Sequence, residues 1–126
     1  MQPDPLMVRG LAGRYGSADK EIRKLLEAMT AVRSSSGKKT MFGGDRYEAA
    51  VKAFLRQLHK TCAVLVEMKL LDPTGKKSSS LSALNSILAS YRLVYLQNPE
   101  AFAVWDDFFR YQVTVEPDST WLRQVL

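Results

Sequence analysis

Apolar residues recur every three or four positions along most of this chain, and this spacing predicts helices with one buried face. A first helix is predicted over 18–34, directly after Ser17, a residue type that caps helix N-termini well. A second helix, the longest, is predicted over 46–71. Asp45 and Glu48 stand at its start in the spacing of a capping box.

Loop residues mark the end of the second helix and the limits of the next three. Pro73 disfavours helical geometry in the residue before it, which ends the second helix in the run Asp-Pro-Thr-Gly. A third helix is predicted over 81–97, and a fourth over 99–112 with Pro99 at its first position. A short last helix is predicted to start near Ser119.

The start of the chain differs from the rest. Residues 1–16 contain three glycines and two prolines without a helical period, so we expect a flexible or docking arm. Such an arm would dock through apolar side chains including Leu6 and Leu11. The remaining chain, 17–126, is expected to form a single helical domain, since one domain usually has about 100–150 residues.

The apolar stripes also give the expected core. The inward-facing positions are Ile22, Leu25, Leu26, Met29, Val32, Val51, Phe54, Leu55, Leu58, Cys62, Leu65, Leu84, Ile87, Leu88, Tyr91, Val94, Tyr95, Phe102, Trp105 and Phe109. Amphipathic helices joined by short polar loops predict an all-α fold. The expected architecture is a small antiparallel bundle of about five helices, four main ones and the short C-terminal one, or else a fragment of a helical solenoid.

Composition narrows the class of protein further. Hydrophobic residues make up 46% of the chain, which is ordinary for a globular domain and too high for a disordered one. The single cysteine, Cys62, cannot form an internal disulfide. No apolar run reaches the roughly 18 residues that a membrane span needs, and residues 1–14 lack the layout of a secretory signal. We therefore expect an intracellular protein that does not contact membranes.

Charge is distributed unevenly along the chain. Residues 1–77 carry fifteen Lys and Arg against eight Asp and Glu, whereas residues 78–126 carry three against five. Lys52, Arg56 and Lys60 share one face of the second helix, away from its apolar stripe. With the lysine pairs of two serine-rich loops, the candidate contacts to phosphate or to an acidic partner are Lys38, Lys39, Lys52, Arg56, Lys60, Lys76 and Lys77. The alternative is a solvated helix face without a partner.

Large aromatic residues concentrate in the last third of the chain. Most of them are expected to fill the core, but one helix rarely buries five aromatic side chains. At least one of them is therefore expected to face solvent or a partner protein. The candidate hydrophobic partner contacts are Trp105, Phe108, Tyr111 and Trp121.

No pattern of catalytic or cofactor-binding residues accompanies these features. His59 is the only histidine, so His59 and Cys62 do not complete a set of metal ligands. Cys62 lies in an apolar stripe with nothing nearby in sequence to lower its pKa. The glycine-rich segments lack the Lys-Ser or Lys-Thr pair of a phosphate-binding loop. We expect no enzymatic activity, no cofactor and no metal.

The sequence therefore predicts a non-enzymatic helical protein–protein interaction module, a subunit or domain of a larger assembly. The alternative function is that of a nucleic-acid-binding subunit. It would contact the phosphate backbone through the basic face of the second helix and the lysine-rich loops.

Overall fold

A computed structural model describes residues 4–35, 43–72, 77–95 and 99–115. This part of the chain forms five helices and contains no strand. The helices are α1 (Pro5–Tyr15), α2 (Ser17–Ser35), α3 (Gly43–Glu67), α4 (Lys77–Val94) and α5 (Pro99–Val115). The predicted all-α fold and its four main helices are confirmed, with ends shifted by a few residues. The short helix predicted near Ser119 lies outside the described residues.

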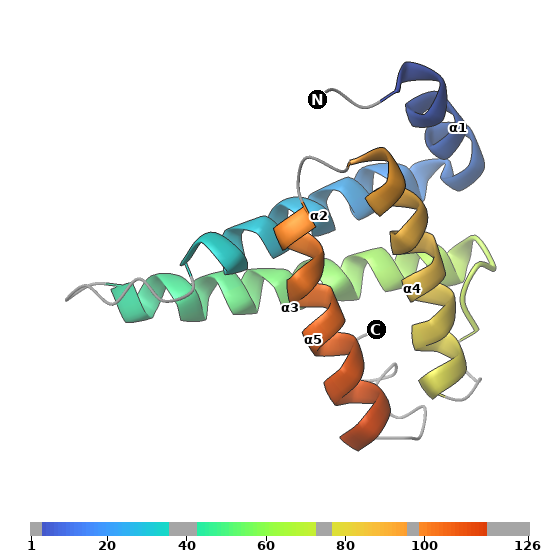
Figure 1. Ribbon diagram of the computed structural model, residues 1–126. Helices are drawn as coiled ribbons and strands as arrows, with labels where there is room; N and C mark the ends of the chain where they lie inside the picture. Colours follow the sequence, from blue (N-terminus) through green and yellow to red (C-terminus); the bar gives the residue numbers. More distant parts are fainter. Residues whose placement is uncertain (1–3, 36–42, 73–76, 96–98, 116–126) are drawn as a thin grey trace.

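The helices form two antiparallel pairs that cross each other (Figure 1). α2 and α3 lie side by side, and the pair formed by α4 and α5 runs across them. α5 packs on both α2 and α4. The chain turns at Gly16, where φ is 52°, so that α1 packs on α2 and α4. The result is a small antiparallel bundle with α2 at its centre.

The core lies where the apolar stripes of these helices meet. Its largest fully buried side chains are Trp105, Tyr91, Phe102, Ile22, Leu25, Met29, Leu58, Leu65, Leu81, Leu84 and Leu88. The inward positions expected from the sequence are buried or half-buried with one exception, Leu55, which is 43% exposed. Leu55 follows the buried Phe54 by about 100° of helix rotation, which carries it past the edge of the stripe.

Most of the N-terminal segment, for which the sequence predicts a flexible or docking arm without a helical period, forms the helix α1. The side chain of Asp4 accepts a hydrogen bond from the backbone N–H of Leu6 at 2.9 Å, and Pro5 occupies the first helical position. Leu11 and Tyr15 are buried against the rest of the bundle, whereas Leu6 is 75% exposed. The cap and the two buried side chains outweigh the cost of about 1 kcal/mol that each helical glycine adds.

α3 ends at Glu67, four residues before the end expected from Pro73. Lys69 takes a left-handed conformation with φ 61°. The N–H of Leu70 donates to the carbonyl of Leu65 at 2.8 Å, and that of Lys69 donates to Val66 at 3.0 Å. This hydrogen-bond pair is a Schellman motif, which satisfies the last carbonyls of a helix and usually places glycine at the left-handed position.

Replacing Lys69 by glycine is expected to raise the free energy of unfolding by about 0.5–1 kcal/mol. A left-handed conformation costs a non-glycine residue about 1–2 kcal/mol, and glycine removes this cost. Part of the stability gained is offset by the greater freedom of glycine in the unfolded chain. Urea unfolding followed by circular dichroism measures the change. Lys52→Gly, at an exposed site inside α3, is the matched control and should destabilise by a similar amount. Destabilisation by both variants would contradict this description of the helix end.

A polar cluster joins α2 to α4. The Tyr91 hydroxyl donates to Asp19 Oδ1 at 2.5 Å, and Arg23 Nε lies 3.1 Å from Asp19 Oδ2. The Arg23 guanidinium also lies 5.9 Å from the ring of Tyr95, which stacks on Tyr91 at 6.2 Å. Burial, and then the hydrogen bond to Asp19, raise the pKa of Tyr91 well above its usual value. The cluster therefore holds a neutral phenol against a carboxylate.

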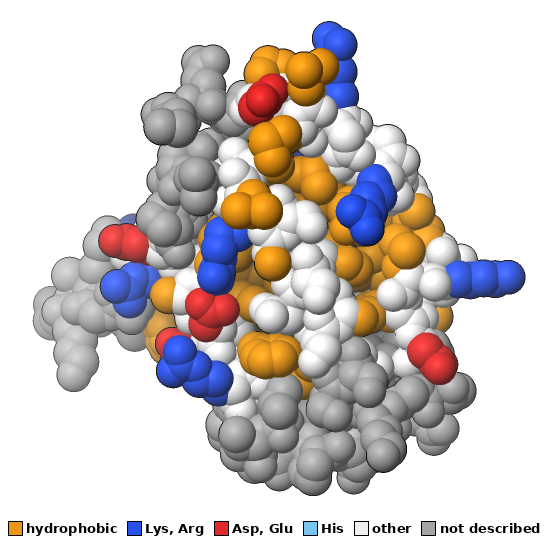
Figure 2. Space-filling model, turned by 45° about the vertical axis from the view of Figure 1, so that its right-hand side comes forward, with side chains coloured by type: hydrophobic (Ala, Val, Ile, Leu, Met, Phe, Trp, Pro, Cys, Tyr) orange, Lys and Arg blue, Asp and Glu red, His pale blue; other side chains and the backbone are white. Residues whose placement is uncertain are grey.

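The exposed hydrophobic side chains of the described residues are scattered over several helices. On the face seen in Figure 2, orange side chains are interrupted by charged side chains and by polar surface. The large exposed hydrophobic residues of α1 and α4 are Leu6, Met7 and Leu93. No helix in the described part of the chain is long and apolar enough to cross a membrane.

Candidate functional site: a pocket between α2, α3 and α5

The candidate contact residues from the sequence have different outcomes. Lys38, Lys39, Lys76 and Trp121 lie outside the described residues. Lys77 begins α4 and Tyr111 lies in the last turns of α5, but their side chains fall outside the described part of the structure. Lys52, Arg56, Lys60, Trp105 and Phe108 can be placed.

Trp105 is a core residue, which corrects its expected role as a partner contact. Its side chain is fully buried, and its indole Nε1–H donates to Asn85 Oδ1 at 2.9 Å. Its ring lies 5.5 Å from Phe108 and 6.1 Å from Phe109. Because no part of its side chain is exposed, Trp105 presents no surface to another protein.

Phe108 stands next to Trp105 on α5 but is only half-buried. Its ring meets Phe54 of α3 edge to face, with ring centroids 5.8 Å apart and an interplanar angle of 85°. Beyond these two rings the helices separate, and a pocket of about 240 Å³ opens between them. Its lining residues are Val32, Arg33, Tyr47, Val51, Phe54, Ala103, Val104, Asp107 and Phe108.

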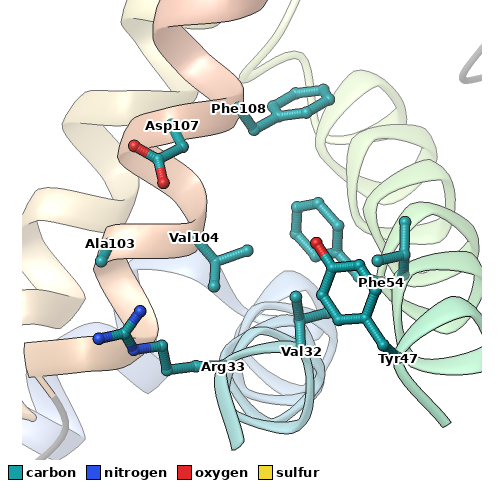
Figure 3. Close-up of a pocket in the computed structure, with 9 residues that line it drawn as sticks. Val32, Arg33, Tyr47, Phe54, Ala103, Val104, Asp107 and Phe108 are labelled. Atoms are coloured by element: carbon teal, nitrogen blue, oxygen red, sulfur yellow. The ribbon is translucent and has the colours of Figure 1, made fainter. Parts of the chain in front are cut away.

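The walls of this pocket are apolar and come from three helices (Figure 3). Val104 and Phe108 reach from α5 toward α3, and Tyr47 and Phe54 face them from the other side. Val32, near the end of α2, lies between the two walls. Tyr47 is 45% exposed, so a large aromatic ring forms part of an open wall.

Helix length explains why a pocket forms at this end of the bundle. α3 has 25 residues and α2 has 19, so α3 is longer by about 9 Å at 1.5 Å per residue. The apolar stripe of α3 begins with Tyr47, Val51 and Phe54, spaced by four and three residues. α5 crosses this end but offers the small Ala103 and the short Val104 toward it, so the described side chains leave a space between the helices.

Charged groups stand only at the rim of the pocket. Arg33 Nε lies 3.9 Å from Glu100 Oε2, and both side chains are more than half exposed. Asp107 is exposed, and no ion pair joins it to another described residue. The Arg33–Glu100 ion pair is exposed and therefore weak. On the other side of the rim, the carboxylate of Asp107 can pair with one positive charge.

The pocket has the size of one large side chain. A cavity of about 150 Å³ can bind a benzene ring, and sites for drug-sized ligands usually start near 300 Å³. The volume of about 240 Å³ lies between these limits. A pocket of this size can hold one large side chain such as that of phenylalanine or leucine.

The lining of the pocket carries few polar side chains. The polar side chains in the lining are Arg33, Tyr47 and Asp107, which do not include a nucleophile paired with a base. Burial raises the pKa of the Cys62 thiol to about 12, so it stays protonated at neutral pH. Among the described residues, no group of three or more His, Cys, Asp or Glu side chains is arranged to hold a metal ion.

Sequence patterns found part of this site. Phe108 was a candidate contact, and Val32, Val51 and Phe54 were expected in the core. Tyr47 is absent from the residues expected from the sequence, because it lies between Asp45 and Glu48, which are interpreted as a capping box. The usable signal was the four-residue spacing from Tyr47 to Val51, which extends the apolar stripe of α3.

The basic face predicted on the second helix is present. Lys52, Arg56 and Lys60 are exposed on α3, and His59 beside them is half-buried. Within the described part of the chain, none of these three cations has an ion-pair partner. The face is thus available to an anionic partner, but the pocket is the place where three helices converge.

Comparison with known proteins adds no assignment to this geometry. A scan against protein-family models found no matching model, and searches of curated proteins and of solved structures found no match.

Proposed function

We propose that the protein is a helical protein–protein interaction module whose pocket between α2, α3 and α5 receives one large apolar side chain of a partner. The observation that carries this proposal is an open, apolar pocket of about 240 Å³ with Tyr47 and Phe108 in its walls. Single aromatic or aliphatic anchors that fill such pockets contribute much of the affinity of protein interfaces.

The shape of the site favours a helix as the partner element. Its two long walls are helices. An amphipathic helix from a partner can lie in a groove between such walls and insert side chains spaced by three, four or seven residues. Asp107 at the rim would pair with a lysine or arginine next to the anchor residue. The proposed partner is therefore an amphipathic helix with a large apolar anchor and a basic neighbour.

A displayed library of helical peptides tests this proposal. It is panned against the wild-type chain and against Val104→Phe, which fills the pocket from its α5 wall. Because the added ring enters existing space, the variant should fold with near-normal stability while its peptide affinity falls at least tenfold. Leu93→Phe adds a ring at an exposed site of α4 and is the matched control.

The sequences of the selected peptides give the second readout. Enrichment of a Phe, Trp or Leu anchor beside Lys or Arg, with binding lost only in Val104→Phe, would support the proposal. Peptides that bind wild type and Val104→Phe equally would show that the pocket is not the binding site.

A further inference from the structure

A second surface, separate from the pocket, is formed by four exposed basic residues on two neighbouring helices. They are Lys20 and Lys24 of α2 with Arg56 and Lys60 of α3, together called the paired-helix basic surface. The sequence singled out only the α3 members, because nothing in the sequence alone places α2 beside them.

Hydrogen bonds between α2 and α3 fix the register of this surface. Gln57 Nε2 donates to the Glu21 carbonyl at 3.1 Å and to Glu21 Oε2 at 2.7 Å. Thr61 Oγ1 donates to the same carbonyl at 3.2 Å. Glu21 lies between Lys20 and Lys24 in sequence. Its partners on α3 are Gln57, which follows Arg56, and Thr61, which follows Lys60. The antiparallel packing therefore places the two basic pairs at the same height along the helix axes.

The four cations point away from the core. Each stands two residues after a buried residue, which is about 200° of helix rotation. The buried residues on α2 are Ala18 and Ile22, and those on α3 are Phe54 and Leu58. Along each helix the two cations are one turn apart, about 6 Å at 1.5 Å per residue. The surface is therefore a block of two rows, fixed by two packed helices.

The described residues neutralise this surface poorly. Lys24 Nζ lies 4.0 Å from Glu21 Oε1, and this is the one ion pair that its members make with described residues. The carboxylate of Glu21 is already engaged by Gln57. Glu27, one turn from Lys24 along α2, is an exposed carboxylate at the margin of the surface. Four cations on adjacent helices with so little compensation favour an external anion.

The side chains around the cations indicate which anion. The large exposed hydrophobic residues of the described chain are Leu6, Met7, Tyr47, Leu55, Leu70 and Leu93, and none of them is in α2. On α3, Tyr47 lines the pocket and Leu55 lies about 100° around the helix from Arg56. Among the described residues, the surface thus lacks the apolar centre of a protein interface and the aromatic rings that stack single-stranded bases.

We propose that the paired-helix basic surface binds the phosphate backbone of double-stranded nucleic acid without reading its sequence. Lysine and arginine contacts to phosphates need neither apolar anchors nor aromatic platforms. Two rigid rows of cations can meet phosphates along one strand or across a groove. This binding is independent of the proposed pocket, which opens on the side of α3 that faces α5.

Fluorescence anisotropy with labelled duplex DNA and duplex RNA tests the inference. Near about 0.15 M salt we expect micromolar affinity, falling linearly on a log–log salt plot with a slope near −3.6 for four phosphate contacts. Arg56→Gln should reduce the slope by about 0.9. The quadruple variant K20Q/K24Q/R56Q/K60Q should lose at least tenfold in affinity.

Matched controls separate this surface from general charge and from the pocket. Arg9→Gln combined with Lys69→Gln removes two exposed cations elsewhere and should leave most of the affinity. Val104→Phe should leave it unchanged. Single-stranded DNA and polyglutamate of matched charge are the competing ligands.

Three outcomes would overturn the proposal. The first is no duplex binding near physiological salt, and the second is an equal loss in the quadruple variant and the control. The third is polyglutamate binding as tight as the duplex, which would assign the surface to an acidic protein. The result that supports it is duplex binding that weakens with salt and depends on these four residues.

Discussion

Replacing Trp105 by alanine is expected to lower the free energy of unfolding by about 3–5 kcal/mol, the usual cost of removing a fully buried Trp. The indole fills the space between α4 and α5 and is fully buried. Its removal also leaves Asn85 Oδ1 without its donor, which is now 2.9 Å away. Since small domains have about 5–15 kcal/mol of stability, this variant should be close to unfolding at 37 °C.

Urea unfolding monitored by far-ultraviolet circular dichroism measures the effect of Trp105→Ala. Leu93→Ala is the control, since Leu93 is 64% exposed on α4 and should change stability by less than about 0.5 kcal/mol. Trp105→Phe separates the two contributions, because it keeps a ring in the core but removes the indole donor. A loss below about 1 kcal/mol for the alanine variant would contradict the core position of Trp105.

Tyr91→Phe is expected to lower the free energy of unfolding by about 1.5–3 kcal/mol, the range for a hydrogen bond to a charged group. The change removes one hydroxyl from a fully buried ring and breaks its 2.5 Å bond to Asp19. Asp19 keeps Arg23 as its ion-pair partner. Tyr95→Phe is the control, because it removes a hydroxyl from the neighbouring, half-buried ring.

The stability difference between wild type and Tyr91→Phe should also depend on pH. Folding raises the pKa of Tyr91, so the folded state favours the neutral phenol. The unfolded chain loses this proton near pH 10, whereas the folded chain holds it. The contribution of Tyr91 is thus complete below about pH 10 and is lost as pH rises further. Unfolding curves across this range would contradict the assignment if the difference stayed constant.

Most of the fold could be predicted because apolar residues recur at helical spacing in the sequence. The stripes on α2 to α5 are long, and the run from Asn98 to Glu100 marks a helix start by its residue types alone. α1 could not be predicted in this way. Its stability depends on Leu11 and Tyr15 packing against distant helices, and that contact is invisible to a local pattern with glycines at 10 and 13.

The candidate sites were less predictable for a physical reason. The pocket depends on α3 being longer than α2 and on α5 crossing its free end, which are properties of packing. Likewise, Trp105 and Phe108 belong to the same apolar group in the sequence, and only the crossing of α4 and α5 decides which ring is covered. Lys20 and Lys24 join the α3 cations through the register that Glu21 and Gln57 set.

The most direct test of the pocket is a methyl NMR titration of the folded chain with indole, a stand-in for a tryptophan anchor. The walls carry the methyl groups of Val32, Val51 and Val104, whose signals report occupancy. We expect saturable shifts of these signals in wild type and in Leu93→Phe, whereas in Val104→Phe the remaining reporters, Val32 and Val51, should no longer shift. Shifts spread over the exposed leucines, or equal shifts in wild type and Val104→Phe, would contradict the proposal that this pocket is the binding site.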